Sequence, residues 1–247
     1  IILGLGLGGV IADTYGWRMA FMVAGAPGLI LAAAVALTIK EPRNQVPAGS
    51  SMPVVAPPSF RQTLVELRKK RTFWLIAVAT GFMNFVGYAH ITFFAPFFLR
   101  VHGAEVATLA HSFGLGPQGF LGIAGALSTG VGGLVGTFLG GVLADRAAIR
   151  DKRAYMSVPA IAGLLMLPFF YLIYTVHSAA LALALGFVPA LLGSLWFGPV
   201  FATVQSVVSP KSRATTTAIH QVALNLIGLG LGPMSIGALI DLLAGPN

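Results

Sequence analysis

One stretch of the chain, Gly132–Arg153, strongly limits the folds that the sequence can adopt. Its first half is apolar and places glycines at positions 132, 136 and 140, which share one face of a helix. Small residues at this spacing let another helix backbone approach closely, as helices do in lipid. The apolar run ends at Asp145, and four basic residues follow by the end of the stretch. It therefore predicts a membrane helix that leaves the bilayer at a basic, cytoplasmic surface.

The composition agrees with a membrane protein, since 56% of the 247 residues are apolar and only 9% are charged. Soluble domains carry roughly 25% charged residues. A spanning helix needs about 20 apolar residues, so we expect a truncated first helix and six complete ones. The runs are too long, and alternate too little, for strands. The predicted fold class is an all-α, polytopic membrane helix bundle with apolar stretches at about 1–13, 19–39, 73–99, 117–144, 155–176, 179–208 and 214–241.

The basic residues predict how these helices are oriented. Of the 15 Lys and Arg residues, 13 fall in the segments 40–71, 146–153 and 211–213, and only Arg18 and Arg100 fall on the other side. Because loops rich in Lys and Arg stay inside the cell, we expect these segments to be cytoplasmic and the protein to lie in the cell (inner or plasma) membrane. The same distribution accounts for the net charge of +8, and we expect no nucleic-acid partner.

Two further features concern the organisation of the chain. Residues 44–60 are rich in Pro, Ser and Ala without periodicity, which predicts a linker. Residues 61–71 predict a short basic helix that lies on anionic headgroups, with a regulatory partner as the alternative. The sequence GLGLG occurs at 4–8 and again at 228–232, in helices expected to run the same way. A repeat over six helices indicates two parallel halves, as in some secondary transporters, and chance recurrence of an apolar, glycine-rich sequence is the alternative.

Motifs near the start of the chain and in its middle resemble those of the major facilitator superfamily. Those that resemble its fifth and sixth helices are Gly16-Trp17-Arg18, Phe21, Gly25, Pro27-Gly28 and Glu41-Pro42-Arg43. Gly141-Val-Leu-Ala-Asp145-Arg146 resembles its G-x-L-A-D-R signature between helices eight and nine. The signature continues with x-G-R-K, but this chain has Ala148 at the glycine position and a basic cluster displaced to Arg150–Arg153. Runs at 145–155, 158–160, 213–214 and 225–233 resemble the spinster-like branch of the superfamily.

The resemblance implies a truncated major facilitator fold that runs from the end of helix five to helix eleven. Residues 1–43 would end the N-terminal half, residues 44–71 would form a cytoplasmic linker with a short helix, and residues 72–247 would form a C-terminal half without its last helix. Many relatives couple transport to protons through carboxylates in helix one or four, and these helices would be missing here.

The implied function is secondary active transport of a small amphipathic or lipid-like solute by alternating access, with protons as the candidate coupling ion. Spinster-like members are linked to export of lysolipids and sphingoid bases. A proton-coupled multidrug or organic-anion exporter of the same superfamily is the alternative, and a seven-helix receptor is a more remote one. We expect a monomer that contacts membrane lipids, and not an enzyme.

Polar residues at mid-membrane depth are the candidate substrate-cavity residues, because a polar side chain in lipid needs a partner or a water-filled cavity. Asn84 and Tyr88 share one helical face, and Gln221 and Asn225 share another. Asn84 and Asn225 both lie roughly 18 Å along their helices from the basic end, near the middle of a bilayer about 30 Å thick. His220 is a further candidate for contact with substrate or proton. Hydrogen bonds between helices are the alternative role for these side chains.

Two other sets of residues are candidates for moving parts. Gly141, Asp145, Arg146 and Arg150 form the signature loop, which the resemblance identifies as a cytoplasmic gate. A helix hinge is expected at Pro189, Gly198 and Pro199, since proline removes a backbone donor and glycine eases bending. The alternative is that these prolines are simply tolerated in a membrane helix. The histidines and carboxylates show no metal-ligand spacing and the glycine runs match no phosphate loop, so no metal site, cofactor or catalytic residue is predicted.

Overall fold

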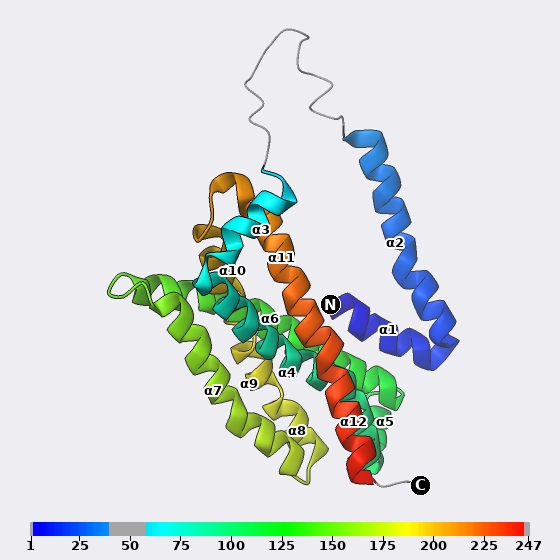
Figure 1. The fold of residues 1–247 in the computed structure, drawn as a ribbon. Helices are drawn as coiled ribbons and strands as arrows, with labels where there is room; N and C mark the ends of the chain where they lie inside the picture. Colours follow the sequence, from blue (N-terminus) through cyan, green and yellow to red (C-terminus); the bar gives the residue numbers. More distant parts are fainter. Residues whose placement is uncertain (1, 40–57, 245–247) are drawn as a thin grey trace.

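The computed structural model describes residues 2–39 and 58–244, so most of the predicted linker lies outside the described residues. The described part is helical and contains no strand, which confirms the predicted fold class (Figure 1). Six helices or runs of helices are long and apolar enough to cross a membrane, as the sequence predicts. They are Trp17–Thr38, Arg71–Val101, Pro117–Ala148, Ala154–Thr175, Ala179–Ser206 and Pro210–Leu243.

The chain starts with α1 (Ile2–Tyr15) and α2 (Trp17–Thr38), which meet at a sharp turn. Gly16 makes the turn with a φ of 83°, a left-handed conformation that residues with a Cβ rarely adopt. α1 packs along α6, whereas α2 packs against α1 and has no buried side chain. In Figure 1 α2 stands beside the rest of the bundle, so its apolar surface is uncovered within the described part of the chain.

The short predicted helix is present as α3 (Phe60–Arg68), and α4 (Arg71–Val101) follows it. α3 starts at a capping box. The backbone N–H of Gln62 donates to the Ser59 hydroxyl, and the backbone N–H of Ser59 donates to the side-chain Oε1 of Gln62. Trp74 closes the turn between the two helices by donating from Nε1 to the Leu67 carbonyl over 3.1 Å.

The middle of the chain contains α5 (Gly103–Ser112), α6 (Pro117–Ala148) and α7 (Ala154–Thr175). α5 is too short to span a bilayer and was not predicted. The glycines at positions 132, 136 and 140 of α6 are buried against the backbone of residues 190–195, which confirms the predicted close approach of another helix. A Cβ at Gly136 would overlap the Leu191 carbonyl oxygen, and a Cβ at Gly140 would overlap that of Leu195.

The stretch 179–208 was expected to form a complete spanning helix with a hinge, and a run of spanning length is present at Ala179–Ser206, but it is divided into three helices. It forms α8 (Ala179–Leu185), α9 (Phe187–Leu192) and α10 (Phe197–Ser206), with breaks at Gly186 and at residues 193–196. Glycine lowers helix stability and proline removes a backbone donor, so a stretch with Gly186, Pro189 and Gly193 is easily broken. The three pieces still form one run of membrane-spanning length.

The last stretch starts with a single 3₁₀ turn, η2 (Pro210–Ser212), and continues through α11 (Arg213–Asn225), η3 (Leu226–Leu231) and α12 (Gly232–Ala244). η3 is a π-helix, and it contains most of the second GLGLG sequence, whereas the first lies in the α-helix α1. The wider turn packs closely on α4, since a Cβ on Gly228 would lie 2.6 Å from the Cβ of Asn84, and α12 continues this contact at Gly232.

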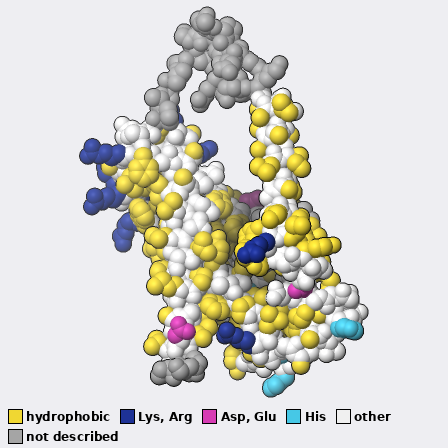
Figure 2. All heavy atoms as spheres, turned by 90° about the vertical axis from the view of Figure 1, so that its right-hand side faces the viewer, with side chains coloured by type: hydrophobic (Ala, Val, Ile, Leu, Met, Phe, Trp, Pro, Cys, Tyr) yellow, Lys and Arg dark blue, Asp and Glu magenta, His cyan; other side chains and the backbone are white. Residues whose placement is uncertain are grey.

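Two apolar clusters hold the helices together, one in each half of the bundle. The first joins α3, α4, α10 and α11, and the second joins α4, α5, α6, α7 and α8. Figure 2 shows most of the visible Lys and Arg side chains at one end of the molecule. We call this the basic end, formed by residues 60–71, 146–153 and 209–213.

Candidate functional site

Three of the predicted cavity residues meet where α4 packs on the junction of α11 and η3. The Tyr88 hydroxyl donates to Asn225 Oδ1 over 3.3 Å. Gly228 lets Asn84 come close, because a Cβ at position 228 would lie 2.6 Å from the Cβ of Asn84. Asn84, Tyr88 and Asn225 are all half-buried. The contact therefore places two amide groups and a phenol at one level of the bundle.

Gln221 belongs to the same region through its backbone. Its carbonyl accepts a hydrogen bond from Asn225 Nδ2 over 2.9 Å, while its side chain is exposed. The side-chain nitrogen of Asn225 thus donates a hydrogen bond within its own helix, and its side-chain oxygen accepts one from Tyr88 of α4. This arrangement fixes the orientation of the Asn225 side chain, with the exposed Gln221 side chain one turn away.

His220 does not join this group, because it lies on a different face of α11. Its side chain is completely buried, with Nε2 3.0 Å from Oγ1 of Thr80 on α4. Phe73 and Phe201 pack edge-on against the ring at centroid distances of 6.4 and 5.7 Å. Contact between His220 and a solute in the Tyr88–Asn225 region is therefore not made in this arrangement.

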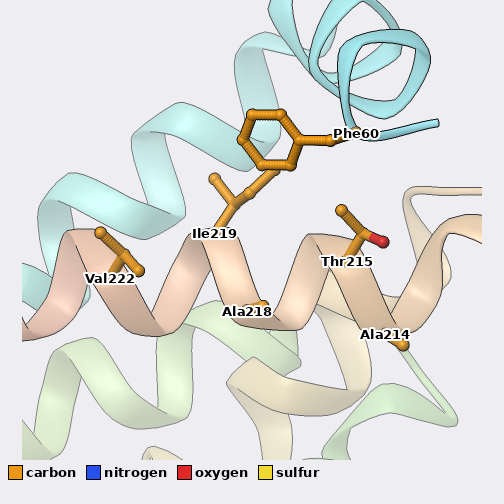
Figure 3. A pocket seen from close by; sticks show the side chains of 6 residues that line it. All are labelled: Phe60, Ala214, Thr215, Ala218, Ile219 and Val222. Atoms are coloured by element: carbon orange, nitrogen blue, oxygen red, sulfur yellow. The ribbon is translucent and has the colours of Figure 1, made fainter.

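An apolar groove of about 480 Å³ runs along the exposed face of α11 near the basic end (Figure 3). Phe60 at the start of α3 leans toward Ile219, and small side chains of α11 form the remaining surface. Thr215 supplies the one hydroxyl of a lining that consists of Phe60, Ala214, Thr215, Ala218, Ile219 and Val222. The groove ends at Val222, next to Gln221, so an apolar surface adjoins the candidate polar residues.

The signature-loop residues lie at the basic end of α6. Asp145 accepts a hydrogen bond from the Tyr155 hydroxyl of α7 over 2.8 Å, and the side chains of Arg146 and Arg150 are exposed. Gly141 packs against the candidate hinge, since a Cβ on Gly198 would lie 3.6 Å from Gly141 Cα. The structure thus brings one residue of the predicted gate and one residue of the predicted hinge close together, although they were predicted as separate sets.

The other hinge candidates lie inside short helices. Pro189 is a buried residue of α9 and Pro199 a buried residue of α10. The breaks in the backbone lie beside them, at Gly186 and residues 193–196. Pro189 still accepts a hydrogen bond at its carbonyl from the Gly193 N–H over 2.7 Å.

Two carboxylates that join helices at the end opposite the basic end were not predicted. Asp13 of α1 accepts a hydrogen bond from the Gly119 N–H in the first turn of α6 over 2.6 Å. Glu105 of α5 accepts from the Ala179 N–H over 2.7 Å at the start of α8. Bonds from Ala179, and then from Ala180 and Ser178, hold the pKa of the Glu105 carboxyl below its ordinary value despite some opposing desolvation. The only sequence signal for either contact is an acidic residue near a helix end.

The geometry defines a class of protein, a polytopic bundle of apolar helices with polar side chains at mid-depth and a charged loop at one end. The Major Facilitator Superfamily family model matches residues 1–233, and the chain belongs to this superfamily.

Among known proteins, the chain is similar to an MFS-type efflux pump of Mycolicibacterium smegmatis, with 29% identity over 95% of this chain and 50% of the relative. It is also similar to crystal structures of a bacterial homologue of the human lysosomal transporter Spinster. The inward-facing unoccupied form matches with a TM-score of 0.70 and 30% identity over 94% of this chain and 47% of that one. The inward-facing occupied form matches with a TM-score of 0.65 and 30% identity over 94% of this chain and 46% of that one. The chain therefore spans about half the length of the relatives that it matches.

Proposed function

We propose that this chain forms part of a secondary active transporter that moves a small amphipathic, lipid-like solute across the membrane by alternating access. The single observation that carries the proposal is the cluster of half-buried polar side chains Asn84, Tyr88 and Asn225, in which the Tyr88–Asn225 hydrogen bond is what the alternative role also predicts. Polar groups at this depth in a membrane helix are costly and mark solute pathways. The similarity to the bacterial Spinster homologue supports the same proposal.

The surroundings of these residues favour a solute that is mostly hydrocarbon. The groove along α11 is apolar, and the described mid-depth surface of α4 and α11 carries no Lys or Arg. A sugar or phosphate would need more hydrogen-bonding groups or an arginine. A solute with one polar head and one apolar chain would place its head at Gln221 and Asn225 and its chain along the groove.

Transport measurements on the protein at its natural length test this proposal. We expect Asn84→Ala and Asn225→Ala each to reduce transport of a lysolipid into proteoliposomes by about tenfold, the factor expected for one lost polar contact in a dry site. Thr175→Val is the matched control, because this exposed hydroxyl bonds only within its own helix. If both asparagine variants transport the lysolipid as well as the control does, these residues are packing contacts and the proposed site is wrong.

A second candidate function is export of drugs, favoured by the similarity to the mycobacterial efflux pump. An exporter of cationic drugs would share the same apolar walls, so the two functions must be separated by substrate. The same proteoliposomes should therefore be tested with a cationic dye. Dye transport that depends on Asn84 and Asn225, without lysolipid transport, would favour the exporter.

A further inference from the structure

The buried face of α11 carries a row of polar side chains that the Tyr88–Asn225 site does not use. Ser212, Thr216 and His220 follow one another at intervals of four residues, so they stack along one face of the helix. Each is at most 1% exposed. This face is opposite in character to the apolar groove of Figure 3, which lies on the exposed side of the same helix.

The row is connected to the surface at the basic end through Glu66 of α3. Glu66 Oε2 accepts from the Ser212 hydroxyl over 3.0 Å, and Oε1 accepts from the Ser209 N–H over 3.3 Å. Glu66 is only half-buried, so it contacts both the surroundings of the molecule and the row. The polar row therefore has one accessible end and one buried end.

The buried end of the row is the contact between His220 and Thr80 of α4. The Thr80 hydroxyl oxygen lies 2.7 Å from the Ile76 carbonyl oxygen and 3.0 Å from His220 Nε2, so when Thr80 donates to Ile76 its oxygen accepts from Nε2. The neutral ring then carries its proton on Nε2 and presents a lone pair at Nδ1. His220 Nδ1 is buried and has no hydrogen-bond partner among the described residues. The ring is therefore ready to accept one proton at that atom.

Two more unpartnered polar atoms lie on the helices that form this row. Within residues 2–39 and 58–244, neither Thr216 Oγ1 nor Thr63 Oγ1 has a hydrogen-bond partner, and both side chains are completely buried. Thr63 lies one turn before Glu66 on α3, which packs against α11. Buried polar atoms are nearly always hydrogen-bonded, commonly by an internal water molecule.

We propose that Glu66, Ser212, Thr216 and His220 form a proton path that leads from the basic end to a proton-binding site at His220 Nδ1, with bound water as the connecting ligand. One turn of α-helix separates successive members by about 6 Å, which is the distance that one water molecule bridges. Each hydroxyl or water accepts a proton on oxygen and releases its own proton to the next. The incoming proton ends on Nδ1, and the ring becomes an imidazolium that still donates from Nε2 to Thr80.

The surroundings of the ring give protonation a mechanical consequence. The groups in contact with His220 are Thr80, Phe73 and Phe201, none of which is charged. An imidazolium without a counter-charge strains the packing of α11 on α4 and α10. Protonation would therefore weaken the same α4–α11 contact that holds Tyr88 against Asn225. The link between protonation and transport rests on the proposed function, whereas the proton-binding site at His220 does not.

The first test measures protonation directly and needs no transport. The protein at its natural length is labelled with ¹⁵N-histidine in micelles, and His220→Gln identifies the signal by its loss. Between about pH 8 and about pH 4, we expect Nδ1 to gain a proton while Nε2 stays protonated throughout. If Nδ1 stays unprotonated over this range, the proposal is wrong.

The second test asks whether the proton uses this path. Thr216→Val keeps the shape of the side chain and removes its hydroxyl, and it should slow proton exchange at Nδ1 by about tenfold. Thr216→Ser should retain the rate, and Thr175→Val, at an exposed hydroxyl that bonds only within its own helix, serves as the control. Equal rates in Thr216→Val and Thr175→Val would exclude the path.

The same variants in proteoliposomes that contain a pH-sensitive dye separate the two proposals. We expect His220→Gln to abolish proton entry that accompanies lysolipid transport. If the unsubstituted protein transports no solute, the proposed function fails and the imidazole measurement still decides the proton site. If transport is normal and independent of His220, transport stands and coupling through this histidine is excluded.

Discussion

At the scale of single residues, the Asp145–Tyr155 hydrogen bond is the specific contact of the signature loop. It joins α6 to α7 at the basic end, far from the Tyr88–Asn225 site. We propose that it stabilises one access state of the gate. Tyr155→Phe and Asp145→Asn should therefore change the transport rate about tenfold while leaving the Kd for the lysolipid within about twofold.

Binding to purified protein and transport by proteoliposomes measure these two quantities separately. Ser157→Ala, an exposed hydroxyl in the first turns of α7, is the matched control. An equal loss of affinity and rate would place Asp145 in the binding site and contradict the role of a gate.

Glu105 gives a residue-scale prediction about pH. Because its pKa is lowered in the folded protein, its stabilising effect is present above the ordinary carboxyl pKa. The effect is lost as the pH falls through the lowered value. Glu105→Gln should therefore unfold at a lower temperature than the parent at about pH 7, and the difference should shrink below about pH 4. Thermal unfolding in detergent at both pH values checks this, and a difference that grows in acid would contradict the assigned hydrogen bonds.

At the scale of elements, the contact between α1 and α6 depends on one carboxylate and several glycines. Asp13 accepts a hydrogen bond from the Gly119 N–H in the first turn of α6, where a negative charge also interacts favourably with the helix dipole. A Cβ on Gly9 would lie 2.9 Å from the Gln118 carbonyl oxygen, so only glycine permits this approach. We expect Asp13→Ala and Gly9→Val each to widen the distance between the two helices.

Spin labels on Tyr15→Cys of α1 and Leu127→Cys of α6, both exposed positions, report that distance, since the chain has no other cysteine. Thr14→Val is the control, because the Thr14 hydroxyl bonds only to carbonyls of its own helix. A distance distribution in Asp13→Ala that matches the control would show that apolar packing alone holds α1 on α6.

Periodicity and glycine spacing predict the spans and the close approach at Gly132–Gly140 because these depend on one helix at a time. The breaks within 179–206 depend on a neighbour, since the carbonyls of Leu191 and Leu195 face the α6 glycines. The π-helix η3 likewise forms against α4. His220 is a cavity candidate in the sequence because it lies one turn from Thr217, but its side chain is buried against Thr80 in the bundle interior.

At the scale of the whole molecule, the distribution of basic residues predicts that the basic end is cytoplasmic. Arg150 and Arg100 lie at opposite ends of the bundle, and both are exposed. A membrane-impermeant maleimide should label Arg150→Cys only in inside-out vesicles and Arg100→Cys only in right-side-out ones. The parent chain, which lacks cysteine, provides the background. The reverse labelling pattern would invert the orientation and place Glu66 on the outer surface.

The π-helix at Leu226–Leu231 has a consequence for how the last span could move. A π turn accommodates one surplus residue within an otherwise α-helical rod, and each α-helical residue turns the rod by about 100°. If the π turn moved along the helix, the segment between its old and new positions would rotate about the helix axis. The two ends of the helix would stay in place. Gly228 and Gly232 face α4 without room for a Cβ, so the rotation would bring larger side chains toward α4 and would require α4 to give way. The Asn225 amide, at the edge of this segment, could then exchange Tyr88 for a solute without any tilt of the helix.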